Sequence, residues 1–426
     1  MIALEFLQHA ARWLGILFIL CYAYQFLYIP VALAPKKKKT VQAPLRRYAI
    51  LISARNEESV IAQLLDSISQ QDYPADLIVP FVVADNCTDA TARVARDAGA
   101  VVYERFNKQQ VGKGYALNYL IQQIRDAWGD EYFDGYFVFD ADNLLQPDYI
   151  SQMNNVFGDP YQIVTSYRNS KNFGDNWISA GYALWFLREA AFLNAPRFRL
   201  GISCMVSGTG FLFSREIMLR YGGWPFHTLT EDIEFSAHSI VQGERIGYCG
   251  AAEFFDEQPT LFGQSWRQRT RWSRGYIQVF LKEGPGLFAG LLGRNSLSCF
   301  DLIMSIMPAM IFTVISLLVS AAIIVLQLIE GHNILPIVIS ALLSSFVPAY
   351  SSLFIVGAIT TITQWQHIHT STVRKILFTL TFPLFMFTYV PICIASVFGK
   401  VEWKPIEHRV SAASLRGRGR EELLPF

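Results

Sequence analysis

The acidic pair Glu231 and Asp232 has the residue types and the position that proton transfer requires. The pair begins a predicted helix over Glu231–Gln242, where the helix dipole favours negative charge. A carboxylate at this place can accept a proton from an attacking hydroxyl group. The alternative interpretation is that both acids only stabilise the start of the helix.

A cationic and aromatic motif follows further along the chain. Gln268, Arg271 and Trp272 lie in a predicted helix just before a very apolar half of the sequence. An arginine can neutralise a departing diphosphate, and an aromatic ring can form a platform for a sugar acceptor. The alternative is an interfacial helix whose arginine side chains reach back to water.

Polar side chains also follow three of the predicted strands. Residues 53–58 and 84–89 follow the first two strands, and Asp140 and Asp142 follow the fourth. Ligands bind at the carboxyl ends of parallel strands, so these side chains are expected to converge on one crevice. Alternate carboxylates at a strand end can hold a divalent cation through oxygen ligands, whereas a plain turn or a helix cap is the alternative.

Two glycine motifs carry weaker signals. Lys113 opens a predicted helix between two glycines, but the segment lacks the frame of a P-loop. Its lysine could face a phosphate or only belong to the helix start. Residues 207–210 precede a predicted strand over Phe211–Phe213, and their small side chains suit either close approach of a ligand or a tight turn.

Short β-rich runs alternate with helical patterns over residues 47–255. The predicted strands are Tyr48–Ser53, Leu77–Ala84, Ala100–Tyr103 and Gly135–Phe139. The predicted helices between them are Glu57–Gln71, Asp89–Asp97 and Lys113–Asp126. This alternation predicts an α/β fold with a mostly parallel sheet whose two faces are covered.

Charge is distributed unevenly along the 426 residues. It is frequent in 36–285 and sparse in 296–400, which predicts one soluble domain between membrane segments. The net charge of +1 gives no sign of a nucleic-acid partner. No pair of the six cysteines has metal or redox spacing, so we expect reduced thiols, as in a cytosolic domain.

Residues 13–35 are uncharged and long enough to cross a bilayer, which takes about 20 apolar residues. A signal peptide is the alternative, but Pro35 would follow the cleavage site and the apolar run is too long. The four lysines of 36–39 come next, and positive flanks remain in the cytoplasm. We therefore expect a multi-pass protein of the cell membrane whose soluble domain is cytoplasmic.

The second half is expected to begin with an amphipathic interfacial helix over Phe262–Lys282, with rings and arginines at headgroup depth, which Gly284-Pro285-Gly286 breaks. Three apolar runs follow, and they are Leu302–Leu328, Ile334–Ile362 and Ile376–Gly399. Three crossings would place the C-terminal tail outside, yet its basic residues between 400 and 420 argue for the inside. The sequence leaves this conflict open.

The expected division of the chain has five parts. They are an anchor with its basic flank at 1–40, a transferase domain at 41–258, amphipathic interfacial helices at 259–297, transmembrane helices at 298–400 and a polar tail at 401–426.

Read together, the motifs resemble the processive membrane glycosyltransferases of family 2, which include cellulose, hyaluronan, chitin and poly-N-acetylglucosamine synthases. The resemblance covers about 47–275 by motif and the flanking spans by layout. The ordered set that carries it is Asp85, Asp140-x-Asp142, Glu231-Asp232 and Gln268-x-x-Arg271-Trp272. It implies a GT-A-type α/β domain in the cytosol, flanked by transmembrane helices, which takes its sugar from a nucleotide diphosphate.

The resemblance also implies a role for each candidate residue. On the donor side, the nucleoside would be held by Arg55, Glu57 and Asp85, with Lys113 also in contact with the nucleotide. The diphosphate and its Mg²⁺ or Mn²⁺ would meet Asp140 and Asp142. On the acceptor side, Asp232 beside Glu231 would be the general base, Arg271 and Gln268 would steady the leaving diphosphate, and Trp272 would stack on the acceptor sugar.

The implied reaction is inverting elongation of a β-linked polysaccharide from UDP-glucose or UDP-N-acetylglucosamine, with translocation of the product across the bilayer. Only one clear span precedes the domain, and the gating-loop motif of cellulose synthases is not evident after Trp272, which argues against cellulose. One alternative is the transfer of a single sugar to a lipid-linked acceptor. The other is a membrane protein that binds a nucleotide sugar without turnover.

Overall fold

The computed structural model describes residues 2–35, 43–331 and 333–399, and its described residues form one eight-stranded sheet. The strand order is β3-β2-β1-β4-β7-β6-β8-β5. The strands are β1 (Tyr48–Ala54), β2 (Ile78–Asp85), β3 (Val101–Arg105), β4 (Gly135–Asp140), β5 (Leu144–Leu145), β6 (Ile163–Ser170), β7 (Phe211–Ser214) and β8 (Ile246–Asp256). The strands β1 to β4 are parallel to one another, and β6 is parallel to β8. β7 is antiparallel to both of its neighbours, β4 and β6, and β5 is antiparallel to β8.

Side chains of the parallel strands alternate between two cores. Leu51 of β1 packs towards α5, and Ile50 packs towards α3 on the opposite face. The helices of this half are α3 (Ile61–Ser69), α4 (Thr91–Asp97), α5 (Lys113–Trp128), α6 (Tyr149–Val156) and α9 (Arg215–Tyr221), with a short 3₁₀ turn at Ala75–Leu77. The predicted strands and helices of 47–140 are therefore confirmed, and most of their ends differ by only a few residues.

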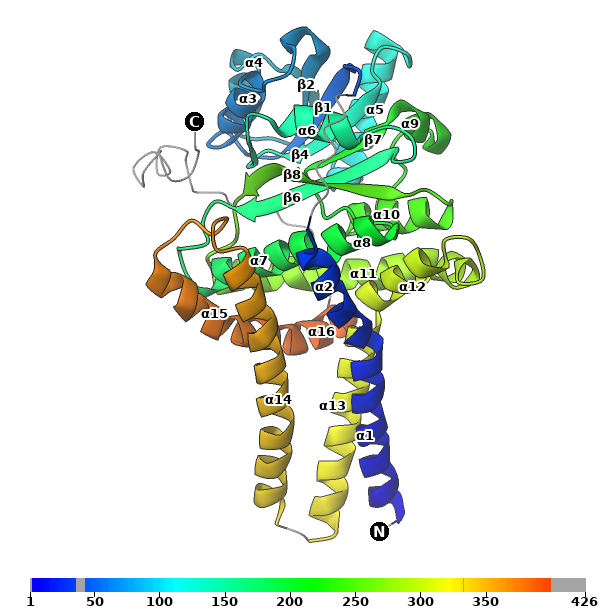
Figure 1. Cartoon of the computed structure of the whole chain (residues 1–426), viewed down its shortest axis with the longest axis vertical. Helices are drawn as coiled ribbons and strands as arrows, with labels where there is room; N and C mark the ends of the chain where they lie inside the picture. The colour runs from blue at the N-terminus through cyan, green and yellow to red at the C-terminus, as the bar shows by residue number, and fades with distance from the viewer. Residues whose placement is uncertain (1, 36–42, 332, 400–426) are drawn as a thin grey trace.

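A layer of helices lies between the sheet and the long helices (Figure 1). It consists of α7 (Trp177–Arg188), a π-helical turn η3 (Glu189–Asn194), α8 (Ala195–Leu200), α10 (Glu231–Val241), α11 (Phe262–Gly290) and α12 (Ser296–Ile306). The predicted break at Gly284-Pro285-Gly286 is wrong, because α11 continues through Pro285. Close packing keeps this segment helical: Leu287 is fully buried, and a Cβ at Gly286 would lie 2.8 Å from Val241.

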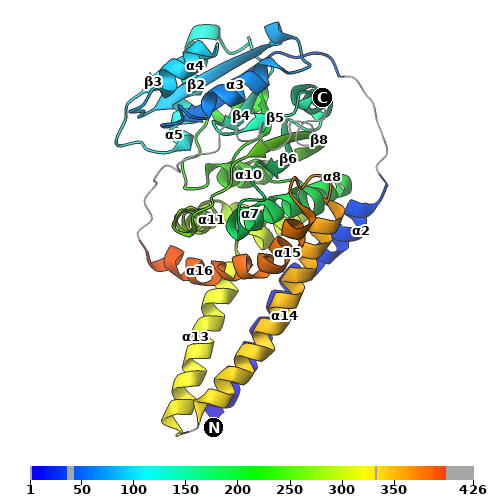
Figure 2. The same cartoon turned by 90° about the vertical axis from the view of Figure 1, so that its left-hand side faces the viewer.

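Three helices extend away from the sheet: α1 (Ile2–Ala23), α13 (Pro308–Ile329) and α14 (Ile334–Thr363) (Figures 1 and 2). By length and composition, the described residues contain 4 helices able to cross a membrane, and they are Leu4–Leu33, Pro308–Ile329, Ser345–Thr363 and Thr372–Phe398. The predicted run Leu302–Leu328 is divided, since its first residues belong to α12 and the long helix begins at Pro308. Proline suits that first helical position.

The predicted N-terminal span at 13–35 is also divided. Its first part belongs to α1, while η1 (Tyr24–Leu27) and α2 (Tyr28–Leu33) pack on the domain. The hydroxyls of Tyr24 and Tyr28 both donate to Asp301 Oδ1, at 2.9 and 2.8 Å. This buried carboxylate also pairs with Arg197 at 2.6 Å, so the anchor is attached to α8 and α12.

The last predicted span, Ile376–Gly399, does not run alongside α13 and α14. It forms α15 (Thr372–Phe387) and α16 (Tyr389–Phe398), which lie across the base of the domain against α7 and α11 (Figure 1). After the domain, α13 leads away from the sheet and α14 returns to it, while Thr372–Phe398 is also long and apolar enough to cross a membrane. The lysines at 36–39 and the tail at 401–426 lie outside the described residues.

Helix α16 also changes the surroundings of the predicted interfacial helix. Arg269 of α11 is fully buried and donates to Thr388 Oγ1 at 2.6 Å. Its guanidinium also lies over the rings of Phe385 and Tyr389, at 4.3 and 4.9 Å from their centroids. This arginine faces the protein, because α16 covers that side of α11.

Candidate active site

One cavity of about 1160 Å³ collects every candidate residue that the sequence singled out. It lies where the strand ends meet the helix layer and the long helices. The candidates in its wall are Arg55, Glu57, Asp85, Lys113, Asp140, Asp142, Glu231, Asp232, Gln268, Arg271 and Trp272. Segments that are distant in sequence therefore form one site.

The turns after β1 and β2 form one end of the site. Asn56 and Asn86 adopt left-handed backbone conformations, with φ of 59° and 53°, which asparagine tolerates better than most residues. Arg105 of β3 donates to the buried Asp85 Oδ1 at 2.6 Å and so fixes the orientation of that carboxylate. Arg105 was not predicted from the sequence, because its partner lies on a neighbouring strand.

Lys113, Asp140 and Gly208 meet in the middle of the cavity. The Lys113 ammonium contacts Asp140 and donates to the Gly208 carbonyl oxygen at 2.7 Å. The Asp140 amide donates to Thr209 Oγ1 at 2.9 Å, so the glycine-rich turn is attached to the end of β4. Gly208 has a φ of +84°, and a Cβ there would lie 3.7 Å from Asp232 Oδ2. The turn therefore lies between Asp140 and the acidic pair.

Asp142 is buried beside the end of β8, where its Oδ2 accepts from the Glu257 amide at 2.9 Å. Among the residues that the structure describes, three or more His, Cys, Asp or Glu side chains nowhere gather closely enough to hold a metal ion. Asp140 and Asp142 supply hard oxygen ligands but too few of them. A divalent cation fits here only if the oxygens of a bound diphosphate complete its coordination.

Glu231 and Asp232 begin α10, and both face the cavity. Burial and, after it, the negative charge of Asp232 together raise the pKa of Glu231 to about 7. Burial also raises the pKa of Asp232, whereas Lys113 and Arg271 lower it. A carboxylate with a raised pKa is a better proton acceptor near neutral pH than an ordinary aspartate.

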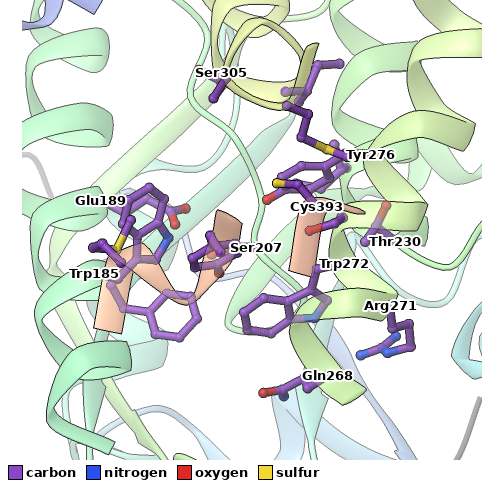
Figure 3. A pocket seen from close by; sticks show the side chains of 18 of the residues that line it. Trp185, Glu189, Ser207, Thr230, Gln268, Arg271, Trp272, Tyr276, Ser305 and Cys393 are labelled. Carbon is purple, nitrogen blue, oxygen red and sulfur yellow. The ribbon is translucent and has the colours of Figure 1, made fainter. Parts of the chain in front are cut away.

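Helix α11 reaches the site because it packs unusually closely on the start of α10. A Cβ at Gly275 would lie 2.5 Å from Thr230 Oγ1, so only glycine fits this contact. Arg271 donates to the Leu229 carbonyl oxygen at 3.0 Å, and Gln278 accepts from the Leu229 amide at 3.0 Å. These contacts hold Arg271 and Trp272 beside Thr230, the residue directly before the acidic pair (Figure 3).

The structure adds residues that the sequence analysis missed. Arg168 of β6 forms an ion pair with Asp256 at the end of β8, and both line the cavity. The Arg168 guanidinium lies 3.6 Å from the centroid of the Phe186 ring. Asp256 lies at the end of a strand, as Asp85 and Asp140 do, but β8 itself was not predicted.

Beyond the polar site, the cavity continues between α1, α13, α14 and α16. Phe18 of α1 and Leu353 of α14 line this part together with small hydroxyl side chains. The hydroxyl residues are Thr313, Ser316 and Ser320 on α13 and Ser345 and Ser352 on α14. Among the described residues that line the cavity, Ala11 of α1 and Ser320 of α13 lie farthest from the sheet on their helices. Both helices continue beyond these residues, away from the sheet.

A family model described as glycosyltransferase-like family 2 matches residues 44–275. Curated relatives include a probable glycosyltransferase, YdaM, of Bacillus subtilis, which is 26% identical over 58% of this chain and 59% of its own length. A beta-monoglucosyldiacylglycerol synthase of Synechocystis is 26% identical over 56% of this chain and 49% of its own. A poly-beta-1,6-N-acetyl-D-glucosamine synthase of Staphylococcus aureus is 21% identical over 56% and 57%. The chain thus spans about half to three fifths of the length of these relatives.

A solved mannosyltransferase from Pyrobaculum calidifontis, determined with GDP-Man and Mn²⁺, has a similar fold. The TM-score is 0.60 at 17% identity, and the alignment covers 92% of this chain and 99% of that one. The likeness therefore includes the long helices as well as the sheet. Together with the family match, it confirms the predicted GT-A-type α/β fold.

Proposed function

Because this chain belongs to glycosyltransferase-like family 2, we propose that it transfers a sugar from a nucleotide diphosphate to an acceptor anchored in the bilayer. One observation carries this proposal: a single cavity is lined both by Asp140 and Asp232 and by apolar faces of α1, α13 and α14. A lipid headgroup can reach the acids in such a cavity while its acyl chains remain between the helices. The alternative of a non-catalytic binder does not need a base, whereas Asp232 lies in the cavity where an acceptor hydroxyl group would meet the donor.

The donor is a UDP-sugar, with glucose or N-acetylglucosamine as the sugar, as in the products that two of the relatives are named for. Its nucleoside binds at the turns after β1 and β2, between Arg55, Glu57 and Asp85. Asp140 and Asp142 are the residues that would hold Mg²⁺ or Mn²⁺ there, and the bound ion would neutralise charge on the diphosphate. Lys113 and Arg271 add fixed positive charge at the same place.

The reaction is one displacement at the anomeric carbon. Asp232 accepts the proton of the acceptor hydroxyl as its oxygen attacks that carbon. The new carbon–oxygen bond forms as the bond to the diphosphate breaks, and UDP leaves with the electron pair of the broken bond. Arg271, supported by Gln268, stabilises the charge on the departing diphosphate. A single displacement inverts the carbon, so an α-linked donor gives a β-glycoside.

A second candidate is elongation of a β-linked polysaccharide with translocation through the membrane. Trp272 favours it, because its ring lines the cavity beside Arg271 and is suited to stack on the last sugar of a chain. On α1 and α13 the described lining of the cavity reaches only to Ala11 and Ser320, short of the far ends of these helices. This favours the lipid acceptor, since a polymer needs a path across the whole bilayer.

The topology follows from the same proposal. The sheet lies in the cytosol, where nucleotide sugars are made, α1, α13 and α14 cross the membrane, and α15 and α16 lie at its inner surface. Val373 and Phe398 of these transverse helices are 74% and 78% exposed, which suits contact with lipid.

Purified protein in lipid nanodiscs, with Mg²⁺ or Mn²⁺, tests both candidates. UDP-glucose and UDP-N-acetylglucosamine are offered separately, and released UDP, lipid-linked sugar and high-mass product are measured. Transfer to lipid without polymer supports the main proposal, and high-mass product from one donor supports the second. If the protein binds donor but releases no UDP with either sugar, both are wrong.

A further inference from the structure

The wall of the cavity opposite Trp272 contains polar groups that the proposed reaction does not use. Trp185 and Glu189 are four residues apart, where α7 passes into the π-helical turn, and both line the cavity with Ser207 (Figure 3). Such π-helical turns are frequent at functional sites. On α11, Trp272 and Tyr276 have the same spacing and line the cavity as well. The cavity therefore lies between two helix faces, and each face carries a tryptophan ring and, four residues later, a side chain that ends in oxygen.

Glu189 adds a carboxyl group to this space. Burial raises the pKa of its carboxyl group, while Arg168, Arg197 and a hydrogen bond from Ser207 lower it. Both arginines already form ion pairs, Arg168 with Asp256 and Arg197 with Asp301. Glu189 lines the cavity, so beside the hydrogen bond from Ser207 its carboxyl group can accept one from a ligand there.

Tyr276 supplies the complementary donor. Burial raises the pKa of its hydroxyl group, and the charges of Glu189 and Asp232 raise it further. The phenol thus keeps its proton at neutral pH and can donate a hydrogen bond. A hydroxyl group of a ligand both donates and accepts, so it can bind Glu189 and Tyr276 together.

Trp185 is held in place through the N-terminal anchor. The Arg188 guanidinium lies 5.2 Å from the centroid of the Trp185 ring and donates to Gln25 Oε1 at 2.6 Å. Gln25 belongs to η1, directly after the crossing helix α1. A rigid ring at this depth can pack against the carbon face of a headgroup.

We propose that Trp185, Glu189 and Tyr276 form an acceptor subsite that selects an uncharged headgroup rich in hydroxyl groups and disfavours a lipid phosphate. The inference rests on the proposed transfer to an acceptor anchored in the bilayer. Its physical reason is that the acids Glu189, Glu231 and Asp232 line this cavity, whereas its cations are engaged elsewhere, Arg168 by Asp256 and Lys113 and Arg271 by the diphosphate of the proposed donor. An anionic headgroup therefore meets acids without free cations, which a hydroxyl group tolerates better.

The test offers three acceptors in nanodiscs: diacylglycerol, glucosyl-diacylglycerol and a polyprenyl phosphate. We expect UDP release with the hydroxyl headgroups to exceed that with the lipid phosphate by about 100-fold. Glu189→Gln removes the charge and weakens a charge-assisted hydrogen bond, so it should raise the acceptor KM by about tenfold or more and leave the donor KM within about twofold. Tyr276→Phe should raise the acceptor KM in the same way. Glu244→Gln is the matched control, because that carboxylate pairs with Arg220 and does not line the cavity.

The outcomes separate the subsite from the reaction. A preference for the lipid phosphate, or an unchanged acceptor KM in both variants, overturns the subsite while the transferase function stands. Donor binding without UDP release on any acceptor overturns the transferase function itself. If Glu189→Gln no longer binds the donor and so is misfolded, the preference of the wild-type protein and the Tyr276→Phe variant decide.

Discussion

At the scale of single residues, Asp232 carries the chemistry of the proposal. Its carboxylate lines the cavity next to Gly208, so it can reach a hydroxyl group that approaches from the membrane side. Burial raises its pKa overall, while the charges of Lys113 and Arg271 favour the ionised form and limit the rise. An aspartate that only stabilised the start of α10 would need neither the cavity nor the nearby cations Lys113 and Arg271.

Replacing Asp232 by Asn tests this role directly. Because the amide cannot accept the proton, we expect turnover to fall by about 10² to 10⁴ while the donor Kd changes by less than about threefold. UDP release and donor binding are measured on the same preparation. Asp126→Asn on the exposed side of α5 is the control and should behave as the wild type. Normal turnover in Asp232→Asn would rule out Asp232 as the base.

The acidic pair also predicts opposite effects of pH on activity and on stability. The pKa values of Glu231 and Asp232 are raised above their ordinary values of 4.5 and 3.8, and that of Glu231 is raised to about 7. In the pH window between the ordinary and the raised values, the folded protein therefore binds more protons than the unfolded chain. As pH rises through it, the contribution of the pair to stability falls, while turnover rises because the base loses its proton.

Melting temperatures and UDP release between pH 5 and pH 8 check this expectation. Glu231→Gln should weaken the fall in melting temperature with pH, because one of the two raised groups no longer titrates. Identical pH profiles of stability in the variant and the wild type would show that Glu231 has an ordinary pKa.

At the scale of elements, the site depends on how closely α10 and α11 pack. Gly275 is the contact point, and Thr230 occupies the space that a Cβ would need. We expect Gly275→Ala to move α11 away from the acidic pair, lower turnover at least tenfold and destabilise the fold by about 1–3 kcal/mol. Gly263→Ala, on the same helix, would meet only Arg267 at 3.8 Å and should retain activity. Equal activity of the two variants would contradict this account of the packing.

The sequence predicted the elements whose signal is local. The parallel strands β1 to β4 were found because each is a short apolar run before a polar turn. β6 and β8 were missed, since β6 ends in the polar segment Tyr167–Ser170 and β8 contains Gly250 and Glu253. The run Ile376–Gly399 was predicted as a span from its hydropathy, which measures apolar length and not direction, and the structure places it as α15 and α16 across the base of the domain. Their place beneath the domain comes from contacts such as Arg269 with Thr388.

At the scale of the whole molecule, the eleven candidates come together because the strand ends, α10 and α11 face the same cavity. Their types and order were legible in the sequence, and the resemblance to a family supplied their roles. The missed residues depend on tertiary structure: Arg105 and Asp256 act with partners on other strands, and Glu189 faces the cavity at a π-helical turn that carried no recognised sequence signal. The extension of the cavity between the long helices was likewise not predictable from local pattern.

The part of the cavity between α1, α13 and α14 can be tested by filling it. Ser316 on α13 and Ser352 on α14 line the cavity within the apolar region, away from the acids. Phe at both positions should fill the space, so we expect transfer to membrane lipid to fall at least tenfold, while the donor Kd and slow hydrolysis of the donor by water persist. Leu318→Phe on the 65% exposed outer face of α13 is the matched control. If the double variant still glycosylates membrane lipid at the normal rate, the acceptor reaches Asp232 from the aqueous side, and the helices α1, α13 and α14 serve only to hold the domain at the membrane.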